Sequence, residues 1–277
     1  MTKIKKAIQY IFIAIIAIPV ILFYHFFFMC PYSKNPSKIP FEKRYQKARR
    51  LSSIVVKAFF SRYFTYNLDV FNKSEKQGML VINHYSNLDP LVVCACCSKP
   101  VTFVGKVEAF SFPFVGKILK VLEAYPLDRD NVVSQFTTIK NIVSHLKDEK
   151  KPPIVVFIEG TRNKHPETPC LPFHPGTLKM AAMAGVNVYP SALYGSFRHL
   201  TLKSFLHHYP IFVNIADPIT PEEVKNSDLN ELAEKVRKNV DDKVNEFRKM
   251  DQCFIYRQLL TNHRKALETI VDIGVKS

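Results

Sequence analysis

The sequence lacks internal repeats, low-complexity stretches and any linker that would divide it into two globular parts. The missing repeats exclude solenoid and array architectures, and no stretch is disordered by its composition. Strand-forming and helix-forming stretches alternate without a break after residue 64. We therefore expect one α/β domain over residues 65 to 277.

Acidic residues are scarce: 24 Asp and Glu stand against 39 Lys and Arg, which gives a formal charge of +15. Such a balance implies an anionic partner, either nucleic acid or an anionic membrane. The chain carries no nucleic-acid-binding motif. Its Phe and Tyr residues crowd the N-terminal segment and do not interleave with basic residues. These features favour an anionic phospholipid membrane over nucleic acid.

The six cysteines lack the spacing of a metal site. Cys94, Cys96 and Cys97 form a close trio on a predicted helix, but no second pair with zinc-like spacing follows. The pattern therefore favours packing in a reducing compartment over a disulfide or a metal, and we expect no metal site.

One long apolar run extends from Ala7 to Met29 and is interrupted only by Gln9, Pro19 and His25. At ~1.5 Å per residue, a helix of this length reaches across a ~30 Å hydrocarbon core. Basic residues flank it at both ends: Lys3, Lys5 and Lys6 before it, and Lys34, Lys38, Lys43, Arg44, Lys47, Arg49 and Arg50 after it. Positive charge on both sides disfavours a single crossing, because such residues stay in the cytoplasm.

Three arrangements of this segment stay open. We favour a monotopic hairpin, in which the apolar run and a basic helix over Phe41 to Phe64 enter one leaflet and return. A spanning helix is the second, and a cleaved signal peptide is the third, although no small-residue cleavage site follows. In the hairpin, residues 1 to 64 form a membrane anchor at the cytoplasmic face. Basic residues then meet anionic head groups, namely Lys43, Arg44, Lys47, Arg49 and Arg50.

Short apolar runs and amphipathic stretches predict the elements of the domain. Strands are expected at Asn67 to Phe71, Met79 to Ile82, Val101 to Val104, Ala124 to Leu127, Ile154 to Ile158, Val186 to Leu193 and Ile211 to Ile215. Helices are expected at Leu88 to Cys97, Pro113 to Leu122, Val132 to Lys147, Thr177 to Ala184, Pro221 to Met250 and Gln252 to Ile273.

A histidine and an aspartate follow the strand that ends at Ile82. His84 lies just past its carboxyl end, and Asp89 lies five positions later, where Pro90 suits the start of a helix. An imidazole paired with a carboxylate can take a proton from an alcohol at neutral pH. On a regular helix the two side chains would lie ~140° apart, so the turn is needed to bring them together. A loop histidine beside a helix-capping aspartate is the alternative interpretation.

Basic side chains follow the other predicted strands. The strand that ends at Ile158 leads into Glu159-Gly160-Thr161-Arg162, where Gly160 lets a ligand approach the backbone and Arg162 offers a planar fork for phosphate. Lys106 and Arg129 are two further candidate phosphate contacts. Each of the three cations, taken alone, also fits a solvated surface charge.

Four blocks occur in order: Asn83-His84 with Asp89, Gly105-Lys106 with Pro113, Gly116 and Arg129, Phe157-Ile158-Glu159-Gly160-Thr161-Arg162, and Tyr189-Pro190. In this order the chain resembles the glycerolipid acyltransferases. Within them it is most similar to the 1-acylglycerol-3-phosphate, or lysophosphatidate, acyltransferases. The resemblance covers roughly residues 65 to 220 and implies a mixed sheet flanked by helices.

The resemblance also assigns roles. His84 resembles the family's catalytic base, and Asp89 resembles the residue that orients it. Further residues match positions of the family's motifs. Lys106 falls on the basic position of the second block, and Arg162 falls on the position that contacts the acceptor phosphate. Glu159 and Gly160 lie in the same turn, and Pro190 matches the proline of the site wall. Three positions depart from the family pattern: Ala109 replaces Leu, Ile158 replaces Pro and Asn163 replaces Ser.

The implied reaction moves a fatty acyl group from an acyl thioester to the free hydroxyl of lysophosphatidic acid, which gives phosphatidic acid. The donor would be acyl-CoA or acyl-acyl carrier protein as co-substrate, with no other cofactor. Glycerol-3-phosphate or another lysophospholipid is an alternative acceptor. A non-catalytic membrane-binding scaffold is a further alternative, but it would be expected to lose His84 or Asp89, and this chain retains both.

Overall fold

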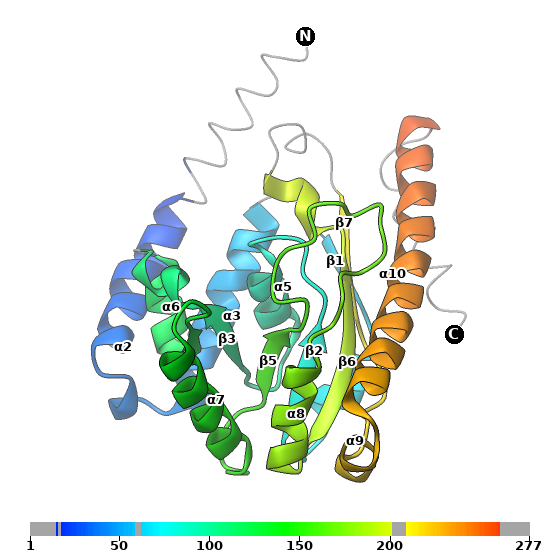
Figure 1. The fold of residues 1–277 in the computed structure, drawn as a ribbon. Helices are drawn as coiled ribbons and strands as arrows, with labels where there is room; N and C mark the ends of the chain where they lie inside the picture. The colour runs from blue at the N-terminus through cyan, green and yellow to red at the C-terminus, as the bar shows by residue number, and fades with distance from the viewer. Residues whose placement is uncertain (1–14, 16–17, 59–61, 113, 201–208, 261–277) are drawn as a thin grey trace.

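The computed structural model describes residues 15, 18–58, 62–112, 114–200 and 209–260. These residues form one seven-stranded sheet in the order β1-β7-β6-β2-β5-β3-β4 (Figure 1). The strands are β1 (Arg62–Tyr66), β2 (Gly78–Ile82), β3 (Thr102–Lys106), β4 (Tyr125–Leu127), β5 (Ile154–Phe157), β6 (Asn187–Tyr194) and β7 (Pro210–Ile215).

The sheet is mixed, because β6 and β7 pair antiparallel while every other neighbouring pair is parallel. β2 lies in the middle, between β5 and β6. The strands from β2 to β6 therefore all point the same way, and their carboxyl ends meet at one edge of the sheet. Loops that follow parallel strands at such an edge are where open α/β sheets bind ligands.

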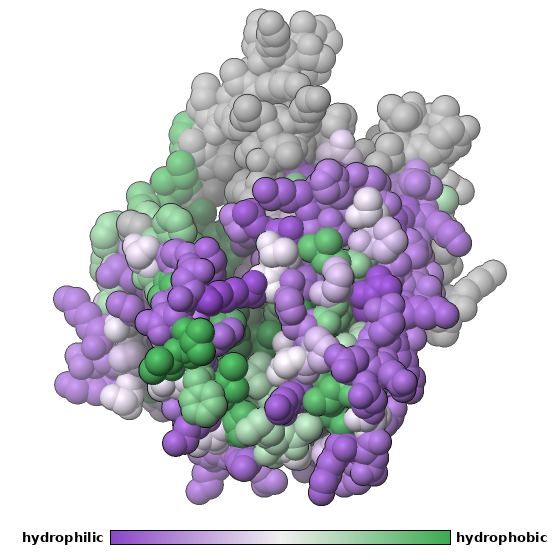
Figure 2. Space-filling view, viewed as in Figure 1, coloured by the Kyte–Doolittle hydropathy of each residue, from purple (hydrophilic) through white to green (hydrophobic). Residues whose placement is uncertain are grey.

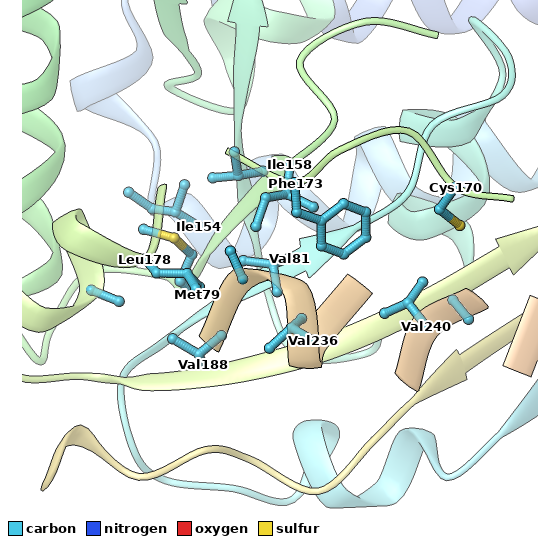
Figure 3. Close-up of a cluster of buried hydrophobic side chains, with 14 of the residues drawn as sticks. Met79, Val81, Ile154, Ile158, Cys170, Phe173, Leu178, Val188, Val236 and Val240 are labelled. Atoms are coloured by element: carbon cyan, nitrogen blue, oxygen red, sulfur yellow. The ribbon is translucent and has the colours of Figure 1, made fainter. Parts of the chain in front are cut away.

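Alternation along the strands explains why both faces of the sheet are covered. All five residues of β2 are buried: Met79 and Val81 pack on one face, Leu80 and Ile82 on the other. Strands buried on both faces read as continuous apolar runs, which is the pattern that predicted them. Figure 3 shows the first cluster, in which β2, β5 and β6 contribute side chains beside Val236 and Val240 of the long C-terminal helix.

Helices cover each face. On the side of Met79 and Val81 lie α7 (Val132–Leu146), α8 (Pro175–Ala184), α9 (Pro221–Asn226) and α10 (Leu229–Leu260). On the side of Leu80 and Ile82 lie α3 (Phe41–Ala58), α4 (Leu68–Asn72) and α5 (Asp89–Cys96). Next to α3 lie α6 (Val115–Val121), α2 (Cys30–Lys34) and the π-helical turn η1 (His25–Met29). Short 3₁₀ turns are η2 (Pro36–Lys38), η3 (Val107–Ser111) and η4 (Ser196–Leu200). The predicted α/β fold with a mixed sheet flanked by helices is confirmed.

The first strand was predicted wrongly. Residues expected to form a strand from Asn67 to Phe71 form helix α4, and the strand is β1, which pairs with β7. Asn67 has a left-handed φ of 58°, which ends the strand and starts the helix. Of the helix expected over Phe41 to Phe64, α3 covers Phe41–Ala58, residues 59–61 lie outside the described part, and the last three residues belong to β1.

The C-terminal helices also divide differently. The helix expected over Pro221 to Met250 is broken between α9 and α10, where the Asp228 carboxylate accepts hydrogen bonds from the backbone of Asn230 and Glu231 (2.8 and 3.0 Å). A side-chain oxygen that satisfies the first N–H groups of a helix favours a new start there. α10 then runs through the expected boundary at Asp251 to Leu260, and the rest of the last predicted helix lies outside the described residues.

Helix α3 packs on the domain. The buried Tyr45 hydroxyl donates to the carbonyl oxygens of Cys97 (3.0 Å) and Cys94 (3.3 Å) on the α5 side. Arg44 is 3% exposed, and its guanidinium donates to Val121 O and to Glu123 Oε1, both at 2.5 Å. The expectation that Arg44 meets lipid head groups is therefore wrong.

Of the other basic residues in that run, Arg49 donates to Ala95 O (3.3 Å), and the Lys47 ammonium lies 4.1 Å from the Phe28 ring centroid. Lys43 and Arg50 are exposed.

The apolar run is described only in part. Residues 18–24 are helical and continue into η1, where Phe26 and Phe27 are 60% and 65% exposed. Figure 2 shows this segment as a green surface on the left of the molecule. His25 is buried, and its ring centroid lies 4.2 Å from that of Phe114 in a tilted arrangement. Within the described part of the chain, no helix is both long and apolar enough to cross a bilayer.

Candidate active site

Asn83 directly follows strand β2 and fixes the start of the site. Its side-chain amide donates to Leu193 O and accepts from Leu193 N, both at 2.8 Å. The buried amide thus repeats the pattern of a strand pair and ties the end of β2 to the end of β6. His84 follows directly.

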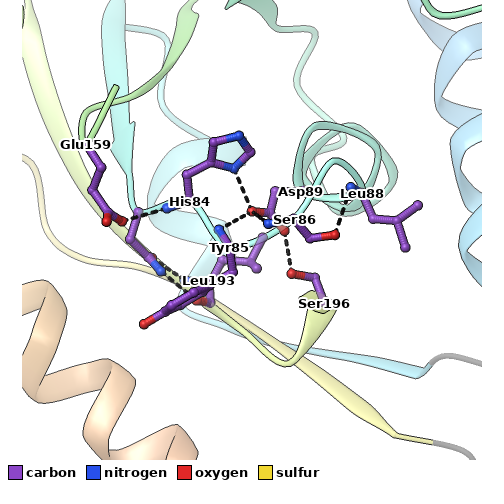
Figure 4. Close-up of polar contacts among 9 residues, drawn as sticks. His84, Tyr85, Ser86, Leu88, Asp89, Glu159, Leu193 and Ser196 are labelled. Atoms are coloured by element: carbon purple, nitrogen blue, oxygen red, sulfur yellow. Dashed lines mark hydrogen bonds and ion pairs between the residues drawn. The ribbon is translucent and has the colours of Figure 1, made fainter. Parts of the chain in front are cut away.

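His84 and Asp89 meet as the sequence predicted. His84 Nδ1 lies 2.8 Å from Asp89 Oδ2, as Figure 4 shows, and the imidazole lies 4.2 Å from the Phe157 ring in a stacked arrangement. The His84 side chain is 17% exposed and Asp89 is fully buried. With Nδ1 donating to the carboxylate, Nε2 carries the free lone pair.

The Asp89 carboxylate accepts further hydrogen bonds besides the one from the imidazole. Oδ2 also accepts from the backbone N–H groups of Tyr85 (2.7 Å) and Ser86 (2.8 Å), and Oδ1 accepts from the Ser196 hydroxyl. Asp89 is the first residue of α5, where the N-terminal end of the helix also favours negative charge. These donors explain how a carboxylate stays in the core.

A second buried carboxylate holds the backbone of His84. Glu159 Oε1 accepts from His84 N (2.7 Å) and Oε2 accepts from Leu171 N (3.0 Å). Burial raises the pKa of Glu159 to about 7, although the two backbone donors act to lower it. Asn163 N donates to His84 O (2.7 Å), so the loop after β5 clamps His84 on both sides of its peptide.

Arg129 reaches the turn after β5. Gly160 has a φ of 69°, and a Cβ placed there would lie 2.6 Å from Arg129 Nη2 and 2.8 Å from His174 Nε2. A glycine is therefore required both for the backbone conformation and for the close approach of the guanidinium. His174 is a residue that the sequence did not single out; it directly precedes α8 and reaches the same turn.

The other cations are placed less tightly. Arg162 and Thr161 are exposed, in the turn that Asn163 ties to His84. Lys106 ends β3, on the far side of β5, and its ammonium is bound to Glu108 Oε1 at 2.5 Å, a contact that raises the pKa of Lys106. Among the placed residues, neither Arg129 nor Arg162 pairs with a carboxylate. Pro113 of the second block lies outside the described residues.

The predicted cysteine trio is buried along α5 and its end. Burial raises the pKa of Cys94 to about 11 and that of Cys97 to about 12, so both thiols stay protonated at neutral pH. In the part of the chain that the structure covers, no group of three or more His, Cys, Asp and Glu side chains converges as metal ligands do.

Several known acyltransferases resemble this chain in sequence. The family model described as Acyltransferase matches residues 63–194. A Mycoplasma genitalium protein named probable 1-acyl-sn-glycerol-3-phosphate acyltransferase is 30% identical, over 83% of this chain and 91% of that protein. The Escherichia coli 1-acyl-sn-glycerol-3-phosphate acyltransferase is 27% identical, over 64% of this chain and 71% of that protein.

The fold has a counterpart among solved structures. The crystal structure of the 1-acyl-sn-glycerophosphate acyltransferase from Thermotoga maritima superposes with a TM-score of 0.70 at 21% identity, over 90% of this chain and 98% of that one. At that identity the likeness concerns the fold alone.

The pKa of Glu159 predicts a pH dependence of stability. A carboxyl group whose pKa rises from 4.5 to about 7 on folding stabilises the protein below pH 4.5, and this contribution is lost as pH rises to 7. Its full size is about 3 kcal/mol. We expect the urea midpoint of the parent to fall between pH 5 and 7.5 relative to Glu159→Gln, which lacks the titrating group. Glu149→Gln, at an exposed position, is the control. A parent-to-variant difference that stays constant with pH would contradict the prediction.

Proposed function

This chain belongs to the 1-acyl-sn-glycerol-3-phosphate acyltransferase family, and on that basis we propose that it acylates 1-acylglycerol-3-phosphate to phosphatidic acid in phospholipid biosynthesis. The observation that carries the proposal is the 2.8 Å contact between His84 Nδ1 and the buried Asp89, at the edge where Arg129 and Arg162 pair with no carboxylate among the described residues. The contact orients a base, and the guanidinium groups offer a site for a phosphomonoester.

In the proposed reaction the imidazole of His84 first accepts a proton and then donates it. His84 Nε2 takes the proton of the acceptor hydroxyl as its oxygen attacks the thioester carbonyl, and Asp89 stabilises the imidazolium that forms. When the carbon–sulfur bond breaks, the leaving thiolate accepts this proton from His84, and the ester and the free thiol are released. The hydroxyl attacks directly, so no acyl-enzyme is required.

The acceptor phosphate is proposed to lie over the turn after β5. Arg162 contributes a planar fork there. The Arg129 guanidinium lies directly against Gly160, where a side chain would leave it no room. Thr161 is exposed in the same turn. Lys106 extends the positive surface, although Glu108 already binds its ammonium.

We also propose that the protein acts at an anionic membrane surface through its N-terminal segment. Exposed Phe23, Phe26 and Phe27 support this attachment, and Lys43 and Arg50 supply exposed positive charge. Apolar side chains of this kind bury in the acyl region while basic residues stay at the head groups. The domain would then receive its lipid acceptor from the bilayer and its thioester donor from the cytoplasm.

The acceptor and the donor can be identified in one assay. Purified protein in detergent is offered lysophosphatidate, glycerol-3-phosphate or lysophosphatidylcholine, each with acyl-CoA or acyl-acyl carrier protein, and free thiol is followed. We expect release to be fastest with lysophosphatidate. Faster turnover of either other acceptor would replace the proposed substrate, and no thiol release with any pair would favour a non-catalytic scaffold.

The base is tested by His84→Ala. Loss of a general base costs on the order of 10²–10⁴ in rate, so acyl transfer should fall by that factor while the variant stays folded. His165→Ala, which removes an exposed imidazole from the loop after β5, is the matched control and should retain the parent rate. Activity of His84→Ala within tenfold of the parent would exclude His84 as the base.

The phosphate contact is tested by Arg162→Ala. Hydrogen bonds to a charged group contribute about 1.5–3 kcal/mol, so the apparent KM for the acceptor should rise roughly tenfold to a hundredfold with little change in the donor KM. Arg162→Lys should recover only part of the loss, because a point charge does not reproduce the fork. Lys164→Ala, at an exposed position in the same loop, is the control. A raised donor KM would instead place Arg162 at the donor phosphates.

The membrane attachment is tested by point changes. Removing residues 1 to 64 would delete α3 and three of the five residues of β1, so loss of binding by that truncation would not distinguish detachment from misfolding. Phe26→Ser with Phe27→Ser should instead lower binding to anionic vesicles, and should reduce turnover of embedded lysophosphatidate more than turnover of a short-chain soluble analogue. Met183→Ser is the control. It changes a side chain of α8 that is 55% exposed, near the edge of the sheet where β6 begins, and this variant should bind to the vesicles as the parent does. Equal binding by all three proteins would contradict the proposal.

A further inference from the structure

Ser196 lies beside the His84–Asp89 pair, although it belongs to none of the four motif blocks. It is the first residue of η4, 107 positions from Asp89 in the chain, and it is fully buried. Its hydroxyl donates a hydrogen bond to Asp89 Oδ1. Figure 4 shows it approaching the carboxylate from the side opposite the His84 ring.

The two oxygens of Asp89 are held by different parts of the chain. Oδ2 accepts from His84 Nδ1 and from the backbone of Tyr85 and Ser86, all within the turn that leads into α5. Oδ1 accepts from Ser196, the one partner that the described residues give it. Local geometry thus sets one oxygen, and a contact across the sheet sets the other.

The corner that presents Ser196 requires a glycine. Gly195, between β6 and η4, has a φ of 98°, and a Cβ there would lie 2.3 Å from Pro210 O. Only glycine fits this conformation and this close approach to β7. Ser196 directly follows this glycine, so the packed corner between β6 and β7 places its hydroxyl beside Asp89.

We propose that Ser196 is a positioning residue for acyl transfer, which acts through Asp89. Its hydrogen bond fixes the rotation of the carboxylate, so that Oδ2 faces His84 Nδ1, and it draws part of the negative charge away from the imidazole. The inference rests on the proposed role of His84 as the base. Without the hydroxyl, more of the charge acts on His84 and favours its protonated form, which cannot accept a proton.

The test is Ser196→Ala, with the acid limb of the pH–rate profile as the readout. We expect kcat/KM at neutral pH to fall roughly tenfold to a hundredfold, and the acid limb to move to higher pH. The acceptor phosphate titrates equally in both proteins, so the difference between the profiles isolates the site. Ser191→Ala is the matched control, because Ser191 is a buried serine of β6 whose hydroxyl donates to Tyr189 O (3.1 Å).

A Ser196→Ala profile that superimposes on those of the parent and Ser191→Ala would overturn the inference, even if the melting temperature falls, because a purely structural role lowers stability without moving the acid limb. If Ser196→Ala does not fold, Ser196→Cys supplies the same test with a weak donor of similar size: a shift to higher pH supports the inference and an unchanged profile contradicts it. Failure of the proposed function looks different, because the parent would then show no acyl transfer or His84→Ala would retain it.

Discussion

The buried carboxylate of Asp89 is the constraint on which the site depends. An ionised group in a core persists only when its lone pairs are filled by donors, and here the donors come from the turn after β2, the ring of His84 and the corner after β6. Those segments must all be in place before the charge is tolerated. Folding of the sheet centre and assembly of the site are therefore one event.

His84 is held by its backbone as well as by its ring. Glu159 accepts from its N–H, Asn163 donates to its carbonyl oxygen, and Phe157 packs under the imidazole. These three residues come from the end of β5 and the loop that follows, while Asp89 comes from the opposite side. These contacts fix the position of His84, which suits its proposed role as a base, because fixed geometry raises the rate of proton transfer.

Much of this was readable from the sequence. Continuous apolar runs predicted the central strands, and the motif order predicted the family and the pairing of His84 with Asp89. Long-range contacts were not readable: nothing near Ser196 or His174 signals that the fold carries them to this edge. The strand β1 was misplaced because its run, Arg62 to Tyr66, is only partly buried and continued a basic helical pattern, so local periodicity gave no clear boundary.

The basic composition divides by burial into structural and accessible charge. The Arg44 guanidinium donates to Val121 O and pairs with Glu123, and Arg198 pairs with Asp251. These guanidinium groups therefore stabilise the fold and offer little to a ligand. Arg129 and Arg162 occupy exposed positions without a carboxylate partner among the described residues. A cation that the fold does not neutralise keeps its attraction for phosphate, and binding then displaces only water. Net charge alone suggested an anionic partner, and burial decides which of the positive residues can meet it.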